Sequence, residues 1–135
     1  PALLGGPGHL VEAFRRLNPA ASERAAAAAL ARFLFRNVEA EKPVTALSGG
    51  ERLRAALACV LTGDEPPQLV ILDEPTNHLD LDSIAAVEAA LRGYDGALLI
   101  VSHDFDFLEA VGVEREIRLR PPSVLSGRTA AGHRA

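Results

Sequence analysis

The sequence predicts an α/β fold in which mostly parallel strands form the core. Two short apolar runs, 69–72 and 97–101, have the length and composition of strands in a parallel sheet. Stretches before, between and after them carry apolar residues at helical spacing, which favours strands connected by helices. The first run is uniformly apolar, so we expect it to be buried on both faces of the sheet.

The composition limits the class of protein. The 135 residues carry a net charge of −4 and are 48% hydrophobic, which suffices for one core. Cys59 is the only cysteine, so we exclude a disulfide framework and a cysteine metal site and expect a buried free thiol. With no bilayer-length apolar run and no secretory leader, we predict a soluble, cytoplasmic chain without direct membrane insertion. The acidic balance argues against a general nucleic-acid-coating role.

The first 46 residues are predicted to form helices followed by a polar connector. A helix is expected at 9–17 and a second at 22–35, with Ser22 as its N-cap and a run of alanines that favours helix. The arginines of the second helix are most simply a solvated face, and an RNA contact is the alternative. The connector occupies 37–46.

A third helix is predicted to begin at Ser48, within the stretch LSGGE. Glu51 follows Ser48 by three residues, as in a capping box, and apolar residues at helical spacing come next. Gly49 and Gly50 fall in the first turn, where backbone N–H groups lack partners inside the helix and glycine lets a ligand approach closely. The pattern therefore indicates an anion site. An ordinary capped helix without a ligand is the alternative.

Polar residues follow both predicted strands at their carboxyl ends. Asp73 and Glu74 come directly after the first strand, and Ser102, His103 and Asp104 follow the second. In open α/β sheets, ligands bind at this edge. Two adjacent acids can divide the work there, since one can hold Mg²⁺ while the other orients or deprotonates an attacking water. The alternatives are a solvated acidic turn and a histidine with no chemical role.

The remainder of the chain is predicted to continue the alternation of helices and strands. A helix follows Asp80, which could serve only as its N-cap. Phe105 and Val111 belong to the apolar face of a short helix, and a further strand is expected at 116–119. From 120 to 135 the composition shifts to Pro, Ser, Gly, Ala and Arg without a period, which predicts a disordered tail.

Four motifs together resemble those of ATP-binding cassette (ABC) ATPases. LSGGE is similar to the signature motif, LVILDE to the Walker B strand, NHLD to the D-loop and SHD to the switch-histidine loop, in the family's order. The stretch DEPTNHLDLDSI resembles the ABC-F branch more than transporter cassettes. The resemblance implies a partial P-loop NTPase fold, with a helical subdomain portion at 1–46 and the C-terminal part of the nucleotide-binding domain at 47–119.

The P-loop of such a cassette has no counterpart in the chain. A P-loop requires G-x-x-x-x-G-K-[ST], and Lys42, the only lysine, is preceded by EAE and followed by proline. We expect the chain to be a truncated part of a longer cassette protein that is inactive alone. A degenerate cassette that has lost its P-loop is the alternative.

The resemblance implies an ATP-binding role for the signature and the D-loop. Ser48, Gly49 and Gly50 would donate hydrogen bonds to the γ-phosphate of an ATP held by a second ABC cassette, in the same chain or in a dimer. Glu51 stands where many cassettes have glutamine, which keeps the capping box but puts a negative charge near the nucleotide. Asp80 would be the D-loop aspartate that links the two sites.

The resemblance also implies the hydrolytic residues. Asp73 would position Mg²⁺, Glu74 would polarise the attacking water, and His103 would contact the γ-phosphate and sense its loss. Three functions follow as hypotheses: an ABC-F ATPase acting on the ribosome and its rRNA in translation or antibiotic resistance, the ATPase subunit of a membrane transporter, and a non-catalytic interaction module.

Overall fold

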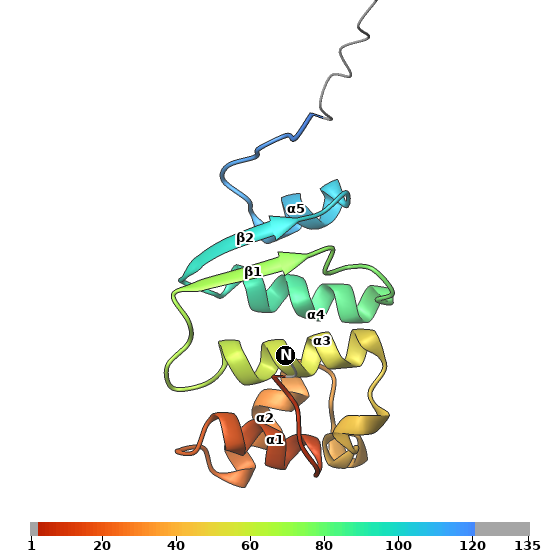
Figure 1. Cartoon of the computed structure of the whole chain (residues 1–135), viewed down its shortest axis with the longest axis vertical. Helices are drawn as coiled ribbons and strands as arrows, with labels where there is room; N and C mark the ends of the chain where they lie inside the picture. Colours follow the sequence, from red (N-terminus) through yellow and green to blue (C-terminus); the bar gives the residue numbers. More distant parts are fainter. Residues whose placement is uncertain (1–2, 121–135) are drawn as a thin grey trace, which may run out of the picture.

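The computed structural model describes residues 3–120, which form stacked layers of helices and one small sheet (Figure 1). The helices α1 and α2 pack on α3, α3 packs on α4, and α4 packs on α5. The helices and strands are α1 (Leu10–Leu17), α2 (Glu23–Arg32), α3 (Gly49–Leu61), β1 (Leu69–Asp73), α4 (Leu81–Arg92), β2 (Ala97–Val101) and α5 (Phe105–Val111). The α/β class and the predicted order of these elements are confirmed.

The second helix is shorter than the sequence pattern predicted. It begins after Ser22, whose hydroxyl accepts a hydrogen bond from the N–H of Ala25 (3.0 Å), but it ends at Arg32 rather than at 35. The chain then bends at Leu34, whose φ of 69° lies in the left-handed region. In a continued helix Phe33 and Phe35 would project in nearly opposite directions, whereas the bend allows both to be buried.

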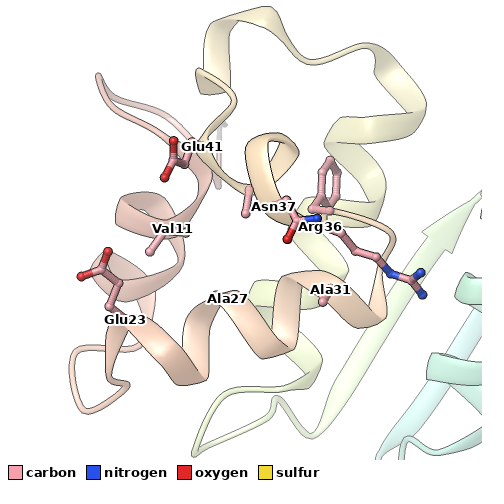
Figure 2. A pocket seen from close by; sticks show the side chains of 9 residues that line it. Val11, Glu23, Ala27, Ala31, Arg36, Asn37 and Glu41 are labelled. Atoms are coloured by element: carbon pink, nitrogen blue, oxygen red, sulfur yellow. The ribbon is translucent and has the colours of Figure 1, made fainter.

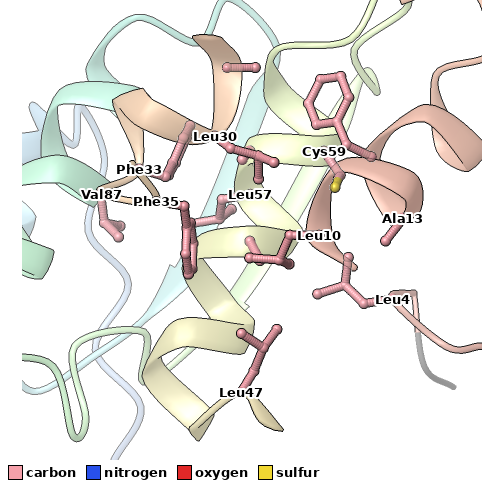
Figure 3. Packing of buried hydrophobic residues seen from close by; sticks show 14 of the residues in the cluster. Leu4, Leu10, Ala13, Leu30, Phe33, Phe35, Leu47, Leu57, Cys59 and Val87 are labelled. Atoms are coloured by element: carbon pink, nitrogen blue, oxygen red, sulfur yellow. The ribbon is translucent and has the colours of Figure 1, made fainter. Parts of the chain in front are cut away.

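Helix α3 is the centre of the hydrophobic core. Its side chains Leu57 and Cys59 are buried against residues of α1 and α2, among them Leu10 and Leu30 (Figure 3). The connector before α3 contains two short 3₁₀ helices, at Asn37–Glu41 and Val44–Ala46. The amino-terminal helices therefore form one packed unit with the helix that carries the LSGGE stretch.

The two strands are parallel, and α4 is the crossover between them. Their register runs from Leu69 opposite Ala97 to Asp73 opposite Val101, so the two strands end at the same edge. The expectation that the first strand is buried on both faces was wrong. Its side chains alternate, and Leu69 and Ile71 remain 53% and 61% exposed. Helices cover one face, and no element within residues 3–120 covers the other.

Two further expectations near the carboxyl end need correction. Phe105 is exposed, and Phe107 together with Val111 forms the buried face of α5. No strand forms at 116–119, where the chain is exposed and has no strand beside it to supply hydrogen bonds. The expected tail lies outside the described residues apart from Arg120.

None of the helices in the described range combines the length and the apolar composition needed to span a bilayer.

The free thiol leads to a reactivity prediction. Burial raises the pKa of Cys59 to about 12, so the thiolate is scarce at neutral pH. Because the thiolate is the reactive form, we expect a disulfide reagent to label the folded chain far more slowly than the chain in denaturant. The measurement is the absorbance, over time, of the chromophore that the disulfide reagent releases when it reacts with the thiol. Equal rates with and without denaturant would contradict the burial of Cys59.

Candidate functional site

The amino end of α3 forms the first group of candidate residues. The hydroxyl of Ser48 accepts a hydrogen bond from the N–H of Glu51 (3.2 Å), and a carboxylate oxygen of Glu51 accepts one from the N–H of Ser48 (2.8 Å). This is the reciprocal capping box that the sequence predicted. Ser48 and Gly49 are exposed, so a ligand can reach the first turn of α3.

The two glycines of this turn have different surroundings. A Cβ atom on Gly49 would meet no other atom within 4 Å. A Cβ atom on Gly50 would lie 2.7 Å from the side chain of Leu79 and 3.3 Å from the carbonyl oxygen of His78. The turn that precedes α4 therefore packs directly on the first turn of α3, and a side chain at Gly50 would have to displace the end of the Leu79 side chain.

Sequence reasoning missed a partner of Glu51. Lys42 belongs to no P-loop pattern, and its ammonium lies 2.6 Å from a carboxylate oxygen of Glu51. This hydrogen bond is the main cause that lowers the pKa of the Glu51 carboxyl, and the N–H of Ser48 adds to it. The two side chains are nine positions apart with no helix spanning both, so no periodicity could have predicted their contact.

The carboxyl edge of the sheet forms the second group. The N–H of Glu74 donates to the carbonyl of Val101 (2.7 Å), which extends the pairing of β1 with β2 by one residue. A ring nitrogen of His103, Nε2, lies 3.5 Å from one carboxylate oxygen of Glu74, and the backbone N–H of His103 donates to the other (3.4 Å). The structure therefore brings Glu74 and His103 into direct contact.

The backbone at Glu74 is unusual for a residue with a side chain. Its φ of 47° lies in the left-handed region, which is uncommon for residues other than glycine. Such a conformation persists when surrounding contacts hold it, as the hydrogen bonds to Val101 and His103 do here. The side chain of Glu74 is 26% exposed while that of His103 is 97% exposed, so the acid is held against the edge and the imidazole is open to a ligand.

Asp80 acts as the N-cap of α4. One of its carboxylate oxygens accepts a hydrogen bond from the N–H of Ser83 (2.8 Å), and the hydrogen bonds from Ser83 lower the pKa of Asp80. The capping role that the sequence allowed is therefore present. Since Leu79 packs near Gly50, Asp80 belongs to a turn that contacts the first turn of α3. Its proposed link to a second cassette stays a prediction.

Asp73 is the residue that could hold a divalent cation. It ends β1, is exposed, and immediately precedes Glu74. Within residues 3–120 no three His, Cys, Asp or Glu side chains gather as a metal cluster. Magnesium usually retains waters and is held by one or two carboxylates together with substrate phosphates, so a single exposed aspartate fits this chemistry.

A separate groove of about 460 Å³ lies between α1, α2 and the first 3₁₀ helix (Figure 2). Its lining includes Val11, Ala27 and Ala31, together with Glu23 and Arg36. None of the candidate residues lines it. The candidate site is instead on the side of the molecule where both strands end and where α3 and α4 begin (Figure 1).

These features define a class of protein. A parallel strand pair that ends in adjacent acids, a histidine in contact with one of those acids, and a capped glycine helix are parts of an α/β nucleotide-binding domain. A family model described as "ABC transporter" matches residues 7–77, and the chain belongs to this family.

Known proteins are similar in sequence to part of this chain. The ATP-binding protein Uup of Caulobacter vibrioides is 49% identical over 77 residues, which cover 57% of this chain and 12% of Uup. The probable ATP-binding protein YheS of Escherichia coli is 43% identical over 90 residues, which cover 67% of this chain and 14% of YheS. Both are ABC-F proteins, so the resemblance to that branch is confirmed. The chain thus spans less than a fifth of the length of either relative.

Solved structures support the same fold. The crystal structure of archaeal ribosome recycling factor aABCE1 in complex with the ribosomal stalk protein aP1 superposes with a TM-score of 0.63 at 22% identity, covering 78% of this chain and 20% of that one. The dimeric structure of MJ0796, a bacterial ABC transporter cassette, gives a TM-score of 0.60 at 24% identity, covering 84% of this chain and 57% of that one. The fold is that of an ABC cassette.

The Glu51 contacts predict an acid-dependent weakening of the amino end of α3. The folded-state pKa of Glu51 is lower than its ordinary value of 4.5, so the carboxylate stabilises the fold above pH 4.5. This contribution is lost as the pH falls from 4.5 through the folded-state value. We expect the hydrogen-exchange protection of the Ser48 amide to fall over that range in an NMR experiment. Glu51→Gln should remove this pH dependence, and an unchanged profile in that variant would contradict the assignment.

Proposed function

We propose that this chain supplies one set of hydrolytic residues and one signature motif to an ABC-F type ATPase that binds and hydrolyses ATP. The observation that carries the proposal is the direct contact of His103 with Glu74 at the carboxyl edge of the sheet. Family membership and the names of the relatives, which are ATP-binding proteins, support it. The fold alone would not identify an activity.

At the sheet edge, Glu74 is the residue proposed to orient and polarise the attacking water. Its two carboxylate oxygens face the N–H and the ring of His103, which orients the carboxylate toward His103. The exposed imidazole of His103 is then available to contact the γ-phosphate. Asp73 would hold Mg²⁺, which when bound offsets the negative charge of the phosphates.

At the amino end of α3, the residues are proposed to act on a different nucleotide. The exposed N–H groups of the first turn and the hydroxyl of Ser48 would face the γ-phosphate of an ATP held by a second cassette. Donors fixed in advance around developing negative charge are the main protein contribution to phosphoryl transfer. Gly49 and Gly50 allow the close approach, and Asp80 would link the two sites. The proposed partner is therefore a second ABC cassette arranged head to tail.

We further propose a cytoplasmic protein that acts on the ribosome. The relatives are ABC-F proteins, and one structural neighbour is titled a ribosome recycling factor in complex with a ribosomal stalk protein. The NHLD sequence supports this branch over the ATPase subunit of a membrane transporter. A non-catalytic interaction module would not require Glu74 to be held against His103.

A chimeric protein tests the hydrolytic role. The 77 matched residues of Caulobacter vibrioides Uup would be replaced by those of this chain. We expect Glu74→Gln in the chimera to retain ATP binding and to slow hydrolysis at the site that Glu74 serves by about 10² to 10⁴-fold, because it removes the base and leaves Asp73 in place. The measurements are phosphate release and equilibrium binding of a fluorescent ATP analogue.

Glu65→Gln is the matched control for that variant. It removes the same charge, but Glu65 lies in the loop before β1, at the opposite end of the strand from Glu74. Its turnover should equal that of the parent chimera. Hydrolysis at the parental rate in Glu74→Gln would refute the proposed role of this residue.

The 135-residue chain alone is expected to show no ATPase activity. Its only lysine is Lys42, outside any P-loop pattern and paired with Glu51, so the chain offers no P-loop for the β- and γ-phosphates. Phosphate release by the purified chain should match that of a Glu74→Gln preparation. Turnover that persists through purification and disappears in Glu74→Gln would show that the chain needs no second cassette.

A further inference from the structure

Glu51 creates an electrostatic problem at the amino end of α3. The proposed function brings a phosphate to this turn, where the helix dipole and the free N–H groups attract anions. A carboxylate in the same turn repels that phosphate. Glu51 nevertheless supports the site, because it holds the N–H of Ser48 in the capping box. A phosphate site at this turn is therefore best served if Glu51 keeps its hydrogen bond from Ser48 while its negative charge is neutralised.

The geometry around Glu51 meets both needs. One carboxylate oxygen accepts the hydrogen bond from Ser48, and the other lies 2.6 Å from the ammonium of Lys42. The backbone of Lys42 is itself fixed, because its carbonyl accepts a hydrogen bond from the N–H of Leu10 (3.2 Å) and its N–H donates to the carbonyl of Glu39 (3.2 Å). The lysine side chain thus starts from a defined position beside α3.

The arginines that follow Glu51 on α3 do not pair with its carboxylate. The guanidinium of Arg52 donates to the carbonyl of Val44 (3.4 Å), and that of Arg54 donates to the carbonyl of Phe33 (2.7 Å). In the part of the chain that the structure describes, the lysine is the one basic side chain paired with this carboxylate.

We propose that Lys42 is a positioning residue for the phosphate site: its ammonium cancels the charge of Glu51, so that the capping box persists while the amino end of α3 still attracts an anion. This inference rests on the proposed function of the signature turn. It assigns a role to Lys42, which lies outside the four motifs. That role arises because position 51 is a glutamate rather than an uncharged glutamine.

The test is the binding of inorganic triphosphate to the 135-residue chain at low ionic strength, followed through the NMR amide shifts of residues 48–51. We expect Lys42→Met to raise the dissociation constant about two- to fivefold, the size of a single charge effect at a helix end. Adding Glu51→Gln to Lys42→Met should restore the parental constant, because glutamine can keep the capping bond without a charge. Lys42→Arg should bind like the parent.

Arg52→Met is the matched control. It removes the same charge from a residue next to Glu51, but the guanidinium does not contact the carboxylate. Any loss of triphosphate binding in Arg52→Met should be the same with and without Glu51→Gln, because the side chains of Arg52 and Glu51 are not paired. A rescue of Arg52→Met by Glu51→Gln as large as that of Lys42→Met would overturn the specific role of Lys42.

Glu51→Gln alone gives a second result that does not depend on how Lys42→Met folds. The charge-cancelling role predicts parental or tighter binding in this variant. If the ion pair is only a structural tether, Glu51→Gln will weaken binding as Lys42→Met does, and the proposal fails. Parental binding in Lys42→Met would also overturn it while leaving the proposed function intact. If the parent chain shows no saturable shifts, the anion site itself is absent, and both proposals fall.

Discussion

The parallel pairing of β1 with β2 is the constraint on which the candidate site depends. Its register places Asp73 opposite Val101, and the N–H of Glu74 extends the pairing to the carbonyl of Val101. Because both strands end together, Glu74, which follows β1, lies beside His103, the second residue after β2. A shift of register by one position would move Glu74 away from the carbonyl of Val101 and from His103.

The features that the sequence predicted correctly follow from local chemistry or from the geometry of parallel strands. The caps at Ser22, Ser48 and Asp80 each involve partners within three residues, and all three form. The order of helices and strands follows from apolar spacing, and the meeting of Glu74 with His103 follows from the rule that parallel strands share a carboxyl edge. Short-range rules therefore predicted the caps and the order of the main elements, and the shared edge of the parallel strands predicted the contact of Glu74 with His103.

The features that were missed depend on distant neighbours. The pairing of Lys42 with Glu51 requires two 3₁₀ helices to bring the connector back to α3, and no spacing rule predicts that path. The end of α2 is decided by the burial of Phe33 together with Phe35 rather than by helix propensity. An apolar strand such as β1 cannot reveal from its composition which of its faces other elements will cover.

The two groups of candidate residues are joined through the turn between β1 and α4. This turn begins at Glu74, which pairs with the end of β2, and it ends at Asp80, which caps α4. Between them, Leu79 packs where a side chain on Gly50 would lie. Since closely packed atoms transmit displacement, a movement of the first turn of α3 cannot leave this turn unaffected. Gly50 thus lets the turn that starts at Glu74 rest against the first turn of α3.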